Sequence, residues 1–159
     1  MDSLLELLKN MDIDSLADTL VPDLSSVLGR VELVLRIAVM AGPLMLLGFG
    51  LVFLLAPPKE ANYGLGYRFW WGMASLEAWQ FTQRVAGMAW TGLGTVLSIV
   101  MSVMCNGMRG MEIMDMVWRA VKCLCWELGL LALACLVING IVVARFDHYG
   151  FRRGTYDEE

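Results

Sequence analysis

Two polar side chains, Glu127 and Asn139, stand in a long apolar stretch near the C-terminal end of the chain. A carboxyl group inside such a stretch is costly as a charge, so it either reaches a base at the end of its helix or stays buried with a function. Both interpretations of Glu127 stay open. Asn139 is expected to hydrogen-bond across helices.

Other groups that could carry chemistry are few. The chain has one histidine, His148, and its cysteines form no C-x-x-C pair, so neither a zinc site nor a disulfide framework is indicated. We expect the cysteines to pack between helices as small apolar residues: Cys105, Cys123, Cys125 and Cys135. Ser75 with His148 is a formal nucleophile and base, but no paired carboxylates accompany them. We therefore expect neither enzymatic activity nor a cofactor or metal.

The composition indicates a membrane protein. Apolar residues make up 58% of the 159 residues and charged residues 18%, and the charged residues cluster in the tails and in two connecting stretches. Lipid imposes that clustering, because every backbone polar group must be satisfied within the spanning segment. A net charge of −4 argues against a nucleic-acid partner, which requires a basic face.

Three apolar windows predict an all-α integral membrane protein with three transmembrane helices, at about 37–56, 85–104 and 123–144. The first carries no charge and is long enough, at ~1.5 Å per residue, to cross a hydrocarbon core of ~30 Å. Pro43 should kink this helix, and Pro57 with Pro58 should end it.

The spans define a membrane domain at 30–147 between an amphipathic N-terminal segment, 1–29, and a polar C-terminal tail, 148–159. We expect short amphipathic helices in the N-terminal segment, broken near Pro22, against lipid or protein. Lysine and arginine are balanced between the two sides, so the positive-inside rule leaves the orientation undecided.

Small residues at helical spacing predict one packing face on each of the later spans, because small side chains let helices approach closely in lipid. The face on the second span consists of Gly87, Thr91, Gly94, Ser98 and Ser102. The face on the third consists of Gly129, Ala132, Cys135 and Asn139.

The segment 57–84 is rich in glycine and aromatic residues, so we expect it to lie along one membrane face and fold back on the bundle. Its tryptophans, Trp79 included, are of the kind that prefers the headgroup zone. Ser75 is the predicted N-cap of a helix that runs unbroken into the second span, with Glu77 in its first turn. On that helix Trp79, Gln83 and Gly87 share a face. Arg68 should lie near the helix ends, within reach of Glu77 or Glu127.

Several fixed spacings in this segment resemble the signature of the SdpI family of small bacterial membrane proteins. An asparagine, a glycine and an arginine are followed by a serine, a tryptophan eleven residues after the arginine, and a glycine eight residues further on. The matching residues are Asn62, Gly66, Arg68, Ser75, Glu77, Trp79, Arg84 and Gly87. The resemblance covers roughly 40–145. Phe69 and Gly72 replace hydroxyl residues of the family pattern, which puts the role of those hydroxyls in doubt.

The resemblance implies a multi-pass protein of the bacterial cytoplasmic membrane, with 57–84 and the C-terminus in the cytoplasm. Its best-known type of function is immunity to a secreted peptide toxin, together with capture of a transcriptional regulator at the membrane. The residues alone leave two roles open: a protein that binds a toxin or regulator, and an accessory subunit of a larger membrane complex. Both roles predict a protein partner in the bilayer, and both are compatible with a homo-oligomer. Two interpretations of the signature residues themselves also stay open. They either form a structural clasp that holds the segment in place or form a surface that contacts a partner.

Overall fold

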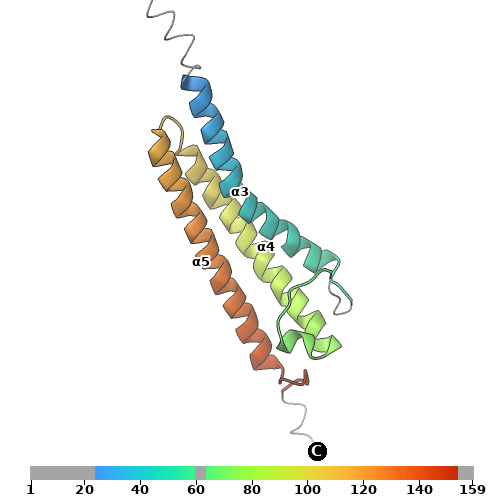
Figure 1. Cartoon of the computed structure of the whole chain (residues 1–159). Helices are drawn as coiled ribbons and strands as arrows, with labels where there is room; N and C mark the ends of the chain where they lie inside the picture. Colours follow the sequence, from blue (N-terminus) through green and yellow to red (C-terminus); the bar gives the residue numbers. More distant parts are fainter. Residues whose placement is uncertain (1–23, 60–63, 154–159) are drawn as a thin grey trace, which may run out of the picture.

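The computed structural model describes residues 24–59 and 64–153, which form three long helices and a short 3₁₀ turn (Figure 1). Helix α3 spans Leu24–Leu55, α4 spans Leu76–Asn106 and α5 spans Ile113–Arg145, while η1 is Trp71–Met73. All three long helices have the length and apolar composition to cross a membrane. The predicted all-α membrane fold is confirmed. The N-terminal segment up to residue 23, with its predicted amphipathic helices, lies outside the described residues.

The helices extend beyond the apolar windows of the sequence. Helix α3 begins well before its window and carries an i, i+4 ion pair there, Glu32 to Arg36 at 2.6 Å, of the kind that supports a helix. Pro43 lies inside α3, and the helix changes direction along its length (Figure 1). It ends at Leu55, two residues before the predicted stop at Pro57 and Pro58.

Helices α3 and α4 share the most extensive contact, and glycines bring their backbones together. A Cβ placed on Gly94 would lie 2.6 Å from the backbone nitrogen of Leu47, and one on Gly87 would lie 3.1 Å from that of Leu54. From the α3 side, Gly50 fits against Thr91 in the same way. The predicted small-residue face of α4 is therefore confirmed at Gly87, Thr91 and Gly94.

The predicted packing face of α5 is wrong at its small residues. Gly129 and Ala132 are exposed, and nothing lies within 4 Å of a Cβ placed on Gly129. Larger side chains fill the interface instead, so close backbone approach is not needed there. The buried residues of α5 are Met116, Ala120, Cys123, Glu127, Ile138 and Val142. Of the cysteines, Cys105 and Cys123 are buried as expected, whereas Cys125 is exposed.

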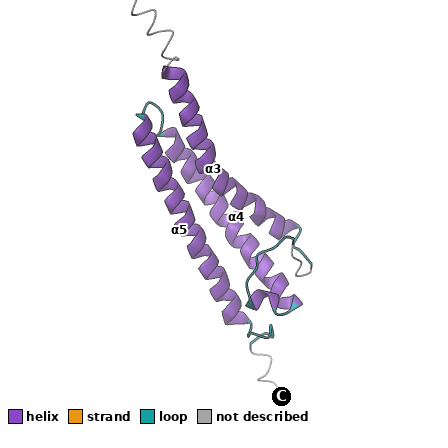
Figure 2. Ribbon diagram, viewed as in Figure 1, coloured by secondary structure: helices purple, strands orange, loops and turns teal. Residues whose placement is uncertain are grey.

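One end of the bundle gathers segments that are far apart in the sequence. The end of α3, the start of α4 and the end of α5 meet there, with the connecting loop and the C-terminal turn beside them (Figure 2). We call this the loop end. Buried Ala78, Val142 and Phe146 pack together at this end, with Phe69, Trp71 and Phe81 around them. The loop is therefore part of the packed structure.

Substitution of Gly94 by alanine should destabilise the bundle, because its Cβ would meet the backbone of Leu47. We expect a loss of about 1–3 kcal/mol, the range for overpacking. The matched control is Gly92→Ala on the same helix, where nothing lies within 4 Å of an added Cβ. The control should gain up to about 1 kcal/mol from helix propensity. Denaturant unfolding in detergent measures both, and equal stability of the two variants would contradict the glycine contact.

Candidate functional site

Gln83 fastens the connecting loop to α4. Its side-chain oxygen accepts a hydrogen bond from the backbone N–H of Tyr67 at 2.8 Å, and its nitrogen donates to the Tyr67 carbonyl at 2.8 Å. Gln83 is fully buried. Both backbone groups of Tyr67 are thus satisfied by one side chain, as buried polar groups require. The pair defines the position of the loop against the helix.

The Tyr67 side chain connects the same loop to α5. Its hydroxyl donates to Oδ1 of Asn139 at 2.8 Å and lies 3.3 Å from the carbonyl of Cys135. Burial raises the pKa of the Tyr67 phenol, so the hydroxyl keeps the proton that it donates. The ring meets Trp90 edge-on at 5.5 Å between centroids. Asn139 therefore makes the predicted hydrogen bond, but to the loop and not to another helix.

Trp79 is a clamp on the loop. Its side chain is fully buried, and its Nε1–H donates to the carbonyl of Pro58 at 2.8 Å. Gly66 lies directly against the ring, since a Cβ there would be 2.6 Å from it, and its φ of +136° is one that glycine adopts readily. The Trp79 ring is therefore packed inside the protein and is not presented at its surface. Its preference for the level of the headgroups stays a prediction.

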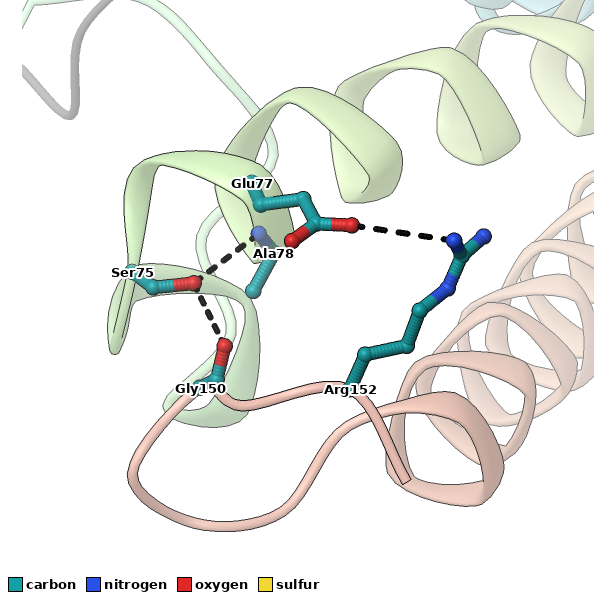
Figure 3. Close-up of polar contacts among 5 residues, drawn as sticks. All are labelled: Ser75, Glu77, Ala78, Gly150 and Arg152. Carbon is teal, nitrogen blue, oxygen red and sulfur yellow. Dashed lines mark hydrogen bonds and ion pairs between the residues drawn. The ribbon is translucent and has the colours of Figure 1, made fainter. Parts of the chain in front are cut away.

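Ser75 joins the start of α4 to the C-terminal turn (Figure 3). It is the predicted N-cap, accepting from the Ala78 N–H at 3.1 Å, and its hydroxyl donates to the carbonyl of Gly150 at 2.7 Å. Glu77 lies 4.0 Å from Arg152 on the same turn, as the dashed line shows (Figure 3). Both side chains of that pair are largely exposed, so it contributes little. Arg152, and not the predicted Arg68, is thus the ion-pair partner found for Glu77.

Asp147 shapes the C-terminal turn that Ser75 contacts. Its carboxylate accepts from the backbone N–H of Tyr149 at 3.0 Å and from that of Phe151 at 2.8 Å. Gly150 adopts a φ of +81° at the tightest point, where a Cβ would lie 2.7 Å from Ser75. The turn is therefore built so that the backbone of Gly150 reaches the helix cap.

Glu127 lies away from the loop, near the middle of α5. It is 8% exposed, and one of its oxygens has no hydrogen-bond partner among the described residues. The other oxygen occupies the space that a side chain at Gly42 would need, 2.7 Å from the position of that Cβ. The predicted pairing of Glu127 with Arg68 is wrong, because Tyr67 meets α5 at Cys135, about 12 Å further along the helix.

The structure separates the signature residues into two groups. Gly66, Ser75, Trp79 and Gly87 are packed against other segments, whereas Arg68, Glu77 and Arg84 are exposed. Asn62 lies outside the described residues. Sequence reasoning missed the roles of Tyr67 and Asp147, and it placed Gln83 on the right face without its partner. The position of Gln83 one helical turn after Trp79 was the available signal that its amide could bind the loop.

An aromatic surface remains open at the loop end. Trp70 is 79% exposed and Tyr149 is 66% exposed. With Met73, Ala74 and His148 they line a shallow cavity of about 510 Å³. We call these five residues the aromatic patch. It combines the loop with the C-terminal turn, and the bond of Ser75 to Gly150 joins these two halves.

These features define a multi-pass membrane protein whose connecting loop is held against its own helix bundle. We call the contacts of Tyr67, Trp79 and Gln83 that hold it the clasp. A model of the SdpI/YfhL protein family matches residues 58–144, more than half of the 159-residue chain. The chain belongs to this family, which is of the membrane-immunity type. No curated protein and no solved structure matched the chain.

Replacement of Gln83 by leucine should release the loop, because the N–H and the carbonyl of Tyr67 lose their partner. Two unsatisfied buried groups correspond to a loss of about 2–5 kcal/mol. Gln80→Leu is the control, since Gln80 is exposed on the same helix. Unfolding in detergent and proteolysis of the loop report the difference. Equal behaviour of the two variants would argue against the clasp.

Replacement of Ser75 by alanine should loosen the C-terminal turn and weaken the start of α4. The lost cap and the lost bond to Gly150 together correspond to about 1–3 kcal/mol. We expect faster hydrogen exchange of the backbone amides in 146–153. Ser102→Ala, at an exposed position on α4, is the control. Unchanged exchange in the Ser75 variant would show that the turn is held by other contacts.

Proposed function

We propose that the chain is an immunity protein of the bacterial cytoplasmic membrane that binds and neutralises a membrane-active or secreted toxin. Membership of the SdpI/YfhL family is the observation that carries this proposal. The mechanism is recognition: the helix bundle and its aromatic loop bind an apolar surface of the toxin and so prevent pore formation or contact with a target. Tethering of a regulator at the loop end is a further part of the proposal.

The aromatic patch is the contact surface that the geometry supports best. The signature residues Trp79 and Gly66 pack against each other beneath the loop. A partner would reach them only if the loop left the helix. Trp70 and Tyr149, in contrast, are already exposed. Large aromatic side chains with a polar edge are the residues that dominate recognition surfaces. Exposed Arg68 and Arg152 add positive charge at the same end.

The loop end is proposed to face the cytoplasm. The support is the resemblance to the SdpI family, whose loop and C-terminus are expected in the cytoplasm. Lysine and arginine are nearly balanced between the two ends of the described chain, so the positive-inside rule does not add to this support. A regulator in the cytoplasm would then meet the aromatic patch directly.

Expression of the chain should protect a host that is sensitive to a secreted peptide toxin, and Trp70→Ala should reduce that protection. The reason is loss of the most exposed aromatic side chain of the patch, with no loss of a buried contact. Survival after challenge measures the effect, at matched amounts of protein in the membrane. A contact of this kind corresponds to a loss in affinity of about tenfold or more.

The matched control is Trp126→Ala, which removes a tryptophan that is 69% exposed on the outer side of α5. It should protect as well as the unmodified chain does. Equal killing with and without the unmodified chain would contradict immunity. Recovery of stoichiometric partner subunits from the membrane without any toxin would favour the accessory role instead.

A further inference from the structure

A small cavity at the loop end brings two cations and an amide together. It has a volume of about 210 Å³ and is lined by Pro57, Pro58, Lys59, Gln80 and Arg84. Lys59 comes from the segment after α3, whereas Gln80 and Arg84 lie one turn apart on α4. Within the described residues neither Lys59 nor Arg84 has an ion-pair partner. Among the described residues, two positive charges thus line one cavity and no acidic side chain lines it with them.

The clasp positions these groups. Trp79 donates to the carbonyl of Pro58 at 2.8 Å, which ties the residue before Lys59 to α4. The close contact of Leu54 with Gly87 sets the end of α3 level with the first turns of α4. Lys59 follows Leu54, and Arg84 precedes Gly87, so both cations lie on the same side of that contact. Two packed contacts therefore hold the backbone segments that carry these exposed side chains next to each other.

The depth of the cavity indicates its ligand. Arg84 directly precedes a charge-free stretch, 85–104, and Lys59 lies four residues beyond the end of α3. Both cations therefore stand where the apolar part of the bundle ends. In a bilayer that level is the boundary of hydrocarbon and headgroups, where lipid phosphates lie. Arginine and lysine are the side chains that bind phosphate oxygens, and an amide can donate to a third oxygen.

We propose that Lys59, Gln80 and Arg84 form a binding site for the phosphate group of an anionic membrane lipid. The arginine contributes paired N–H donors and the lysine a point charge. The rings of Pro57 and Pro58 supply the apolar wall of the cavity. The site is distinct from the aromatic patch, and the proposal does not depend on toxin recognition.

Native mass spectrometry of the full chain released from detergent tests this site, with phosphatidylglycerol and phosphatidylcholine as the two added lipids. The unmodified protein should retain phosphatidylglycerol in preference to phosphatidylcholine. The double variant Lys59→Ala with Arg84→Ala should bind phosphatidylglycerol about 30-fold more weakly, since each cation near the membrane surface accounts for about fivefold. Equal retention of the two lipids by the unmodified protein would overturn the proposal.

The control variant, Arg109→Ala with Lys122→Ala, removes the same charge from exposed positions near the other end of the bundle. It should retain phosphatidylglycerol as the unmodified protein does. An equal loss of lipid binding in both variants would show that overall charge, and not this site, causes the effect, and would overturn the proposal. Excess inorganic phosphate should not displace the lipid; displacement would overturn the assignment to lipid. If the double variant fails to fold, Lys59→Ala alone should lower binding about fivefold, and unchanged binding would overturn the proposal.

Discussion

The close approach of α3 and α4 sets the geometry of the loop end. In lipid no hydrophobic force pulls two apolar helices together, so their association depends on packing that becomes tight only where the backbones can meet. Gly50, Gly87 and Gly94 allow this contact. It places the end of α3 beside the first turns of α4, where Trp79 and Gln83 form hydrogen bonds with the loop. A shift between the two helices would separate these side chains from their partners.

The clasp gives a physical meaning to the family signature. Gly66 fits against Trp79, Trp79 bonds to the loop, and Ser75 joins α4 to the C-terminal turn. These residues hold the architecture of the loop end. Trp70 on the loop stays exposed in this arrangement. Such a design restricts the spacing of these residues, because each residue must meet one defined segment.

The sequence predicted those parts of the structure that follow from the solvent and from local chemistry. Apolar windows located the three helices, the Ser75 cap was recognisable from its own neighbourhood, and small residues marked the α4 face. Contacts between distant segments were not predictable in this way. The bond from Tyr67 to Asn139 depends on how the loop crosses the bundle, and Gly129 resembled a packing residue although larger side chains fill the α5 interface. Spacing gives the face of a helix but not the neighbour that the face meets.

The placement of Glu127 beside Gly42 constrains how the protein is made. A carboxylate at the centre of a single helix costs roughly 2.5–3.5 kcal/mol on insertion from the translocon. Helix α3 is synthesised first and carries, next to Pro43, the one gap in its side chains that receives this carboxyl group. Because α3 precedes α5 along the chain, the space beside Gly42 is already made when the Glu127 carboxyl group is synthesised.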